Sequence, residues 1–232
     1  EPADAPPPTF EKAEPRQALP PAAVPAPAEP AVSQRAPEKQ PGARAAVVTT
    51  VKNFGALADS WVSYHLAIGF THLYVYFDDP AEMATIGLTA RFPADVLTCI
   101  PHDAALRAAW AKLPKSEEKV RLAAKEVQTR QQLNAWHCVG LAVARRLDWL
   151  LHIDADELFH PGPAGDAAAH FEGLSKAGVE TFCYMNHEAV PEAHGIVDPF
   201  REVTLFKRSL ELVARESPGG RQSDPNSLTA KA

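Results

Sequence analysis

The chain of 232 residues has 29 acidic and 23 basic side chains, a formal net charge of −6, and 46% hydrophobic residues. This acidic balance argues against a nucleic-acid groove, because phosphate binding requires a basic face. No run of about 18 apolar residues occurs, so the sequence contains no candidate membrane span. The three cysteines, Cys99, Cys138 and Cys183, form no Cys-x-x-Cys pair, which argues against a zinc knuckle or a dense disulfide framework. The sequence leaves open whether two of the three cysteines form one disulfide and the third is a free thiol.

The segment 1–44 differs from the rest of the chain in composition. It holds 12 of the 22 prolines, interleaved with alanine and glutamate. Such a segment lacks the apolar surface that would offset its ordering entropy, so we expect a disordered linker or stem. Because the chain begins at Glu1 rather than Met, we expect a truncated or processed product, from which a preceding signal or anchor could have been removed.

Strands and helices are expected to alternate from residue 45 onwards. The apolar, β-branched run 45–51 predicts a buried parallel strand. Apolar residues then recur at helical spacing from Leu57 to Ile68, and Gly69 stands where a helix commonly ends. The following segments predict a strand at 73–77, a helix near 81–91 and a strand at 95–100.

The second half of the chain continues this alternation. Residues 117–147 predict the longest helix, with one apolar stripe made of Ala135, Trp136, Val139, Ala142, Val143 and Leu147. After it we predict a strand at 149–153, a helix at about 165–177, and strands at 180–186 and 202–207. This order predicts an α/β fold over 45–210, an open and mostly parallel sheet with helices on both faces. Residues 211–232 are expected to be an irregular tail or a truncated C-terminal part.

Polar residues follow several predicted strands, and ligands of such sheets bind beyond the carboxyl ends of the strands. Asp154 and Asp156 come directly after the strand 149–153. In extended backbone two residues that are two apart project to the same side, so both carboxylates would share one face. Paired carboxylates repel unless a proton or cation lies between them, and hard oxygen ligands favour Mg²⁺ or Mn²⁺. The alternative is a solvated acidic loop that caps the next helix.

Three blocks of the sequence together resemble glycosyltransferase families 2 and 92, over about residues 46–208. They are the opening block with 51–53, 61–65 and 73–79, the central block with Gln131 to Cys138 and 148–158, and the late block with 199–201 and 206–208. The central block, with Asp-Ala-Asp-Glu at 154–157, is the most specific. Phe54 departs from the pattern, because these families usually carry an acidic residue after the asparagine.

The resemblance implies a GT-A-like fold, a divalent metal (Mn²⁺ or Mg²⁺), a nucleoside-diphosphate sugar donor, with UDP-sugar favoured, and a glycan or other hydroxyl acceptor. It implies that Thr50, Lys52 and Asn53 line the nucleotide and that Asp78 or Asp79 faces the base or ribose. Asp154 would contact the ribose or donor sugar and the metal, and Asp156 would hold the metal and its diphosphate. If an anchor has been lost, the Golgi or secretory lumen is favoured over the cytoplasm.

The long helix is expected to supply further donor-binding residues. A crossover helix runs antiparallel to the strands, so the first half of this helix overhangs the strand ends. Arg130, Gln131 and Asn134 would therefore reach the diphosphate or the sugar hydroxyls, and arginine suits phosphate geometry. His137 and Cys138 in mid-helix, and His152 in the strand, are interpreted as core residues. Two alternatives stay open. Lys52 and Arg130 could be solvated surface charges, and Asp78 and Asp79 could simply begin a turn before Pro80.

The acceptor side is less marked in the sequence. An inverting transferase needs a carboxylate that deprotonates the acceptor hydroxyl. Glu188 and Asp198 are the acids in the region after the fifth predicted strand, and Glu188 is favoured as the catalytic base.

Two other function classes stay open. A phosphohydrolase could use Asp154 as nucleophile and Asp156 as acid, but such motifs usually follow the first strand of a domain. No residue after 208 clearly completes a metal shell or an acceptor site, so the chain could be an inactive or fragmentary nucleotide-sugar-binding module.

Overall fold

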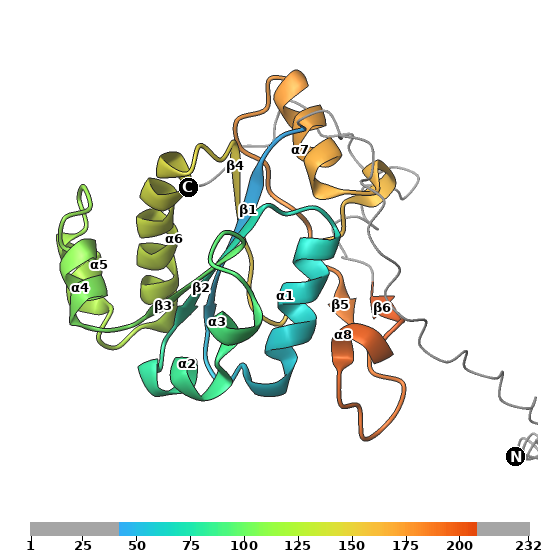
Figure 1. Cartoon of the computed structure of the whole chain (residues 1–232), viewed down its shortest axis with the longest axis horizontal. Helices are drawn as coiled ribbons and strands as arrows, with labels where there is room; N and C mark the ends of the chain where they lie inside the picture. Colours follow the sequence, from blue (N-terminus) through green and yellow to red (C-terminus); the bar gives the residue numbers. More distant parts are fainter. Residues whose placement is uncertain (1–41, 208–232) are drawn as a thin grey trace, which may run out of the picture. The chain divides into compact units, whose positions relative to one another are not determined.

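The computed structural model describes residues 42–207, which form an α/β fold (Figure 1). In chain order the strands are β1 (Ala45–Val51), β2 (His72–Phe77), β3 (Leu97–Pro101), β4 (Trp149–His152), β5 (Glu188–Ala189) and β6 (Phe206–Lys207). The α-helices are α1 (Ala58–Ala67), α2 (Pro80–Ile86), α3 (Leu88–Arg91), α4 (Ala104–Trp110), α5 (Glu117–Leu122), α6 (Val127–Ala144), α7 (Ala167–Lys176) and α8 (Pro199–Glu202). Two short 3₁₀ turns, η1 (Gly55–Leu57) and η2 (Gly162–Ala164), complete the order.

The main sheet has four parallel strands in the order β3-β2-β1-β4. The central strand β1 pairs with both neighbours, so that Val47 lies opposite Leu73 of β2 and Leu151 of β4. All six residues of β2 are buried, as is nearly all of β1. Their continuous apolar runs are the pattern of strands covered on both faces, and the parallel α/β prediction is confirmed.

Helices cover the two faces of this sheet and form two separate cores. Alternate residues of β1 point to opposite faces, so Val47 joins one core and Val48 the other. The first core contains α1 and α7, through residues such as Trp61 and Phe171. The second contains α4 and α6, through residues such as Trp110 and Leu133. The described helices include none that is long and apolar enough to cross a bilayer.

Two details of the helical prediction are wrong. The helix expected over 117–147 is broken into α5 and α6, and only part of its predicted apolar stripe is covered: Ala142 is buried, and Ala135 and Leu147 pack against the second core. Trp136, Val139 and Val143 are exposed by 42%, 51% and 68%, whereas Leu133 and Cys138 are fully buried. The reason is tertiary: α4 and α5 pack on one flank of α6, so Leu133 is covered there while the opposite flank stays open. Sequence periodicity alone cannot distinguish two apolar flanks of one helix.

The last predicted strands are also corrected. Residues 180–186, expected as a strand, form none and are mostly exposed. The strand expected at 202–207 is shortened to β6, because Asp198 caps a helical turn at Pro199. β6 pairs antiparallel with β5 in a separate two-stranded sheet. The expected linker 1–44 falls outside the described residues apart from 42–44, and 211–232 falls wholly outside them.

The three cysteines carry free thiols, so the disulfide that the sequence left open is not formed. Cys138 is buried, Cys99 is half-buried and Cys183 is exposed. Burial raises the pKa of the Cys99 thiol to about 11. The fold is therefore stabilised by apolar packing rather than by covalent links.

Replacing Val47 by Ala is expected to lower the free energy of unfolding by about 2–3 kcal/mol, because two methyl groups are lost from a fully buried site. The matched change Val197→Ala, at a side chain that is 78% exposed, should alter it by less than about 0.5 kcal/mol. Urea unfolding followed by tryptophan fluorescence measures both values. Equal costs in the two variants would contradict the central place of β1.

Candidate functional site

The first half of α6 is hydrogen-bonded to three strand ends at the carboxyl edge of the sheet. Arg130 donates to Asp78 after β2, with Nε–Oδ1 2.5 Å and Nη2–Oδ2 2.7 Å. Asn134 Nδ2 donates to Thr50 Oγ1 at the end of β1 over 2.9 Å, and Gln131 Nε2 donates to Asp154 Oδ1 after β4 over 2.9 Å. Six residues that the sequence indicated as donor-binding candidates are thereby brought to one edge.

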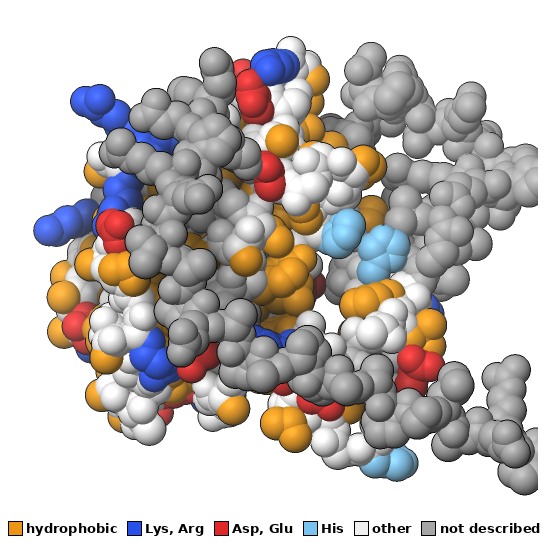
Figure 2. Space-filling model, turned by 45° about the vertical axis from the view of Figure 1, so that its right-hand side comes forward, with side chains coloured by type: hydrophobic (Ala, Val, Ile, Leu, Met, Phe, Trp, Pro, Cys, Tyr) orange, Lys and Arg blue, Asp and Glu red, His pale blue; other side chains and the backbone are white. Residues whose placement is uncertain are grey.

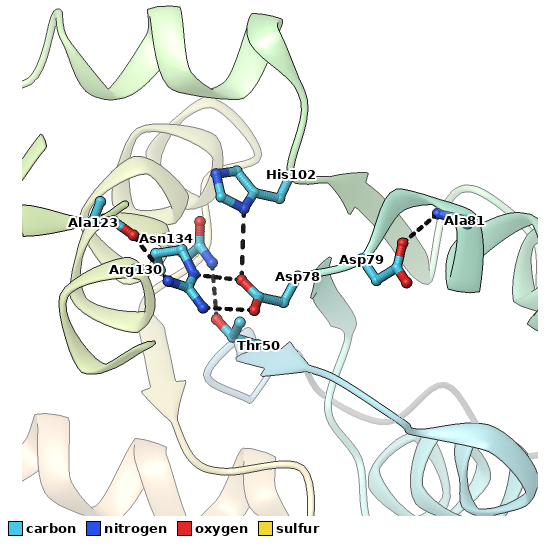
Figure 3. A network of polar contacts seen from close by, with 8 residues as sticks. All are labelled: Thr50, Asp78, Asp79, Ala81, His102, Ala123, Arg130 and Asn134. Atoms are coloured by element: carbon cyan, nitrogen blue, oxygen red, sulfur yellow. Dashed lines mark hydrogen bonds and ion pairs between the residues drawn. The ribbon is translucent and has the colours of Figure 1, made fainter. Parts of the chain in front are cut away.

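The Arg130–Asp78 pair lies at the centre of this edge (Figure 3). The two side chains are only 12% and 9% exposed, and the remaining guanidinium group Nη1 donates to the Ala123 carbonyl over 2.9 Å. The hydrogen bonds from Arg130 hold the pKa of Asp78 below its usual range. Arg130 is thus a bidentate clamp between α6 and β2, rather than the solvated charge that the sequence left as its alternative.

His102 is a member of this site that sequence reasoning missed. It follows β3, its Nδ1 lies 3.6 Å from Asp78 Oδ1, and its ring lies 5.0 Å from that of Trp110 (Figure 3). Burial lowers the pKa of His102. Its position in the sequence could have indicated it, since a polar residue directly after a strand of this parallel sheet lies at the same edge as the other candidates.

Two buried polar atoms at this edge have no hydrogen-bond partner among the described residues: His102 Nε2 and Asn134 Oδ1. A buried polar group without a partner costs on the order of 1–3 kcal/mol. Such a cost is compensated where water or a bound ligand supplies the missing partner. These two atoms therefore leave unused hydrogen-bonding capacity beside this edge of the sheet.

The loop after β1 is shaped by an acid that comes from α2. Asn53 adopts a left-handed backbone with φ 57°, and its N–H donates to Glu82 Oε2 over 2.9 Å. The Phe54 N–H donates to the other carboxylate oxygen of Glu82. Phe54 itself is buried against Trp61, with the ring centroids 5.9 Å apart. An acidic group is therefore present beside Asn53, but Glu82 supplies it from another element.

Lys52 and Asp79 have different surroundings. Lys52 is exposed at the end of β1. The Asp79 carboxylate accepts a hydrogen bond from Ala81 N over 2.9 Å and is the N-cap of α2, directly before Pro80. Asp79 therefore begins the turn into α2, as the alternative interpretation of this residue predicted.

The acidic block after β4 forms a turn, which corrects the extended backbone expected for Asp154 and Asp156. Glu157 N donates to the Asp154 carbonyl over 3.2 Å, and Asp154 N donates to Glu157 Oε2 over 3.3 Å. Asp154 and Asp156 are both exposed. Burial raises the pKa of Glu157, and the nearby Asp154 and Asp156 charges raise it further. Local hydrogen bonds set the direction of these carboxylates. The alternation of side chains along an extended strand, on which the prediction rested, does not include such bonds.

Helix α1 holds this acidic turn through three side chains. Trp61 Nε1 donates to the Glu157 carbonyl over 2.9 Å, and Tyr64 OH donates to the Phe159 carbonyl over 2.9 Å. His65 Nε2 accepts from Phe159 N over 3.3 Å, while its Nδ1 lies 2.8 Å from the Trp61 carbonyl. The neutral tautomer with hydrogen on Nδ1 satisfies both contacts. The backbone after Asp156 is thereby fixed against the first core.

Glu188, the predicted base, lies on β5, is exposed, and pairs with Lys207 at 3.6 Å. Asp198 caps α8 and accepts a hydrogen bond from Ser60 of α1. The interpretation of Cys138 as a core residue is confirmed, and half-buried His137 contacts Tyr76 OH at 2.8 Å. His152 differs from the expected core histidine in being exposed at the end of β4, although neighbouring groups desolvate its imidazole and lower its pKa.

Metal binding by protein groups alone finds no support at this edge. Over residues 42–207 no three His, Cys, Asp or Glu side chains are grouped so that they could hold a metal ion. A site with Asp154 and Asp156 as ligands would need oxygen atoms from a ligand or from water. Mg²⁺ is often bound in this way, through one or two carboxylates and substrate phosphates.

Comparisons with known proteins give two relatives, both from Arabidopsis thaliana and both named glycosyltransferase-like. One is 26% identical over 171 residues, which cover 67% of this chain and 36% of that protein. The other is 23% identical over 170 residues, which cover 71% of this chain and 33% of that protein. The chain therefore spans about a third of the length of these curated relatives. No protein-family profile and no solved structure matches it.

Replacing Arg130 by Ala is expected to lower the free energy of unfolding by about 2–4 kcal/mol, because the nearly buried Asp78 carboxylate loses its partner. The matched variant Arg91→Ala breaks the pair with Asp59, whose side chains are 43% and 54% exposed, and should cost less than about 1 kcal/mol. Urea unfolding compares the two. A loss in Arg91→Ala as large as that in Arg130→Ala would contradict the clamp.

Acidification is expected to destabilise the fold through His65. Burial lowers the pKa of His65 from 6.5 to about 4. Between these values the unfolded chain binds a proton that the native chain excludes, so stability is complete above pH 6.5 and falls as the pH approaches 4. The loss amounts to about 3 kcal/mol. As the pH is lowered from 6.5 to 4, the free energy of unfolding of His65→Gln should fall less steeply than that of His187→Gln, a control variant at an exposed histidine that keeps His65. Parallel curves for the two variants would refute the assignment of this pH dependence to His65.

Proposed function

We propose that this chain binds a nucleoside-diphosphate sugar at the carboxyl edge of the sheet and transfers the sugar to a hydroxyl acceptor. The observation that carries the proposal is the link from α6 to three strand ends, which gathers Thr50, Asp78 and Asp154 beside each other. In open α/β sheets this edge is the place where ligands bind. The two relatives named glycosyltransferase-like support the reaction class.

The proposed metal is Mn²⁺ or Mg²⁺, held by Asp154 and Asp156 together with the diphosphate of the donor. The two exposed carboxylates fit such an ion only if the phosphates complete its shell, because residues 42–207 hold no group of three suitable side chains. When bound, the ion neutralises charge that develops on the leaving diphosphate. We therefore expect the metal to bind with the nucleotide rather than before it.

The protein groups have separate proposed roles. Lys52 offers an exposed cation for phosphate, and Asn53 and Thr50 line the nucleotide. Gln131 keeps Asp154 oriented through its 2.9 Å hydrogen bond, and Asn134 presents a buried oxygen without a described partner. The remaining candidates, Asp78, Asp79 and Arg130, form the wall of the site, in which Asp78 and Arg130 neutralise each other. UDP is the favoured nucleotide on the family resemblance.

The acceptor is proposed to be a glycan or another hydroxyl compound, with Glu188 as the base that removes its proton. A second candidate function is donor binding without transfer. It is favoured by the 3.6 Å pair between Glu188 and Lys207, which engages the proposed base. Transfer and binding are therefore measured separately.

The test is a thermal-shift screen of nucleoside diphosphates with and without Mn²⁺. One nucleotide should raise the midpoint by several degrees at about 100-fold excess over Kd, and only when Mn²⁺ is present. Asp156→Ala should weaken this Mn²⁺-dependent binding at least about tenfold, since one of two carboxylate ligands is lost. Asp95→Ala, at the opposite end of β3, is the matched control and should bind as the parent does.

The outcomes separate the candidates. Mn²⁺-dependent nucleotide binding with sugar transfer supports the transferase, and loss of transfer in Glu188→Gln with unchanged nucleotide affinity supports the base. Binding without transfer or donor hydrolysis supports the binding module. No shift with any nucleotide refutes both.

A further inference from the structure

The loop that follows β1 is held by one carboxylate. Asn53 N donates to Glu82 Oε2 over 2.9 Å, and Phe54 N donates to Glu82 Oε1. Asn53 has a left-handed backbone, with φ 57°. Residues other than glycine rarely adopt this conformation, although asparagine does so more readily than most. Two consecutive N–H groups that donate to one charged acceptor therefore stabilise a turn that the sequence alone does not enforce.

Glu82 lies in the first turn of α2, which is itself fixed. Asp79 accepts a hydrogen bond from Ala81 N and caps the helix directly after β2. Further along α2, Met83 and Ile86 pack against the first core. The Glu82 carboxylate therefore reaches the loop from a helix that is anchored both to the end of β2 and to the core.

Lys52 lies between two fixed points of the backbone. On one side Asp78 N donates to the Val51 carbonyl over 2.9 Å, which continues the pairing of β1 with β2. On the other side Glu82 holds the two residues that follow. The hydrogen bonds from Arg130 and, to a smaller extent, the charge of Lys52 lower the pKa of Asp78. The exposed Lys52 cation is therefore presented beside the strand ends.

The same loop is also tied to the acidic turn. The Phe54 ring lies 5.9 Å from the ring of Trp61, at an interplanar angle of 74°. Trp61 Nε1 donates to the Glu157 carbonyl over 2.9 Å. One buried tryptophan thus contacts both the loop that carries Lys52 and the acidic turn. The separation between this cation and the proposed metal ligands is therefore set before a ligand arrives.

A diphosphate needs such placed groups, because the chain offers it little general attraction. The formal net charge is −6. On the face of the molecule shown in Figure 2, the Lys and Arg side chains of the described residues lie among Asp and Glu side chains. A mixed surface of this kind does not concentrate anions. The affinity for a diphosphate therefore depends on where single cations are held.

We propose that Glu82 is a positioning residue for the diphosphate, because it holds the loop 52–54 in the conformation that places Lys52 beside the strand ends. The inference rests on the proposed function and adds to it a residue that acts through the loop. A loop that adopts its competent conformation only part of the time lowers the apparent affinity by that fraction. Glu82 keeps that fraction high.

The first test replaces the carboxylate by an amide. Glu82→Gln keeps the size of the side chain, but its NH₂ group cannot accept from an N–H, so one of the two hydrogen bonds is lost. In NMR spectra of the ¹⁵N-labelled 232-residue chain, the amide protons of Asn53 and Phe54 should move upfield, since charge-assisted hydrogen bonds are the stronger ones.

Nucleotide affinity is measured on the same variant. Calorimetric titration with UDP, GDP, ADP and CDP, each with Mn²⁺, identifies the nucleotide that binds the parent chain, and its Kd should rise about tenfold in Glu82→Gln. Glu118→Gln, at an exposed residue of α5, makes the same change of charge. This control should keep the parent's Kd and the parent's Asn53 and Phe54 signals.

A second pair of variants changes the loop and leaves Glu82 in place. Asn53→Gly and Asn53→Ala lose the same side chain, but only alanine is strained at φ 57°. Asn53→Gly should therefore bind the nucleotide several-fold more tightly than Asn53→Ala. The difference isolates the backbone conformation from any contact of the Asn53 side chain, and it decides the matter if Glu82→Gln does not fold.

Three results would count against the positioning role of Glu82. If none of the four nucleotides binds the parent chain, the proposed function fails and this inference fails with it. If one binds, but with the same Kd in Glu82→Gln or with equal Kd values in the two Asn53 variants, this inference alone is overturned. Asn53 and Phe54 signals that stay in place in Glu82→Gln would show that Glu82 is not their acceptor, and would overturn it as well.

Discussion

The hydrogen bonds between the first half of α6 and the strand ends are the constraint on which the site depends. Three side chains of one helix contact three different strands, so the positions of Thr50, Asp78 and Asp154 are coupled. The Arg130–Asp78 pair has the shortest contacts of the three and is nearly buried. Its low exposure makes it costly to leave either partner alone, which holds α6 in register over the sheet.

A second set of contacts acts from the other face of the sheet. Helix α1 uses Trp61, Tyr64 and His65 to bind the backbone that follows the acidic turn. The turn is therefore held by α6 through Asp154 and by α1 through Glu157 and Phe159. The exposed carboxylates sit on a backbone that is fixed at both ends. Such pre-positioning favours ligand binding, because little ordering is left to be done when the ligand arrives.

The charge distribution at this edge also has a physical consequence. Asp78 is neutralised by Arg130, so the uncompensated negative charge of the site lies at Asp154 and Asp156. A cation is therefore attracted to the acidic turn rather than to the wall formed by β2 and α6. In the function proposed above, this separation would let an anionic diphosphate approach an acidic protein once a bound metal reversed the local charge.

The sequence by itself determined the four strands of the main sheet and the edge at which the polar residues gather. Both follow from local rules: continuous apolar runs predict buried parallel strands, and residues that follow such strands share one edge. For that reason Thr50, Asp78 and Asp154 could be predicted as neighbours. His102 could have been added by the same rule, since it follows β3.

Only the tertiary structure decided which flank of α6 is buried, how the carboxylates of the acidic turn are directed, and which polar groups pair. The flank depends on α4 and α5, which cover Leu133 and leave Val139 exposed. The turn at Asp154 depends on a hydrogen bond to Glu157, and the pairing of Arg130 with Asp78 joins residues 52 positions apart. These features arise from contacts between elements, and no periodicity along the chain encodes them.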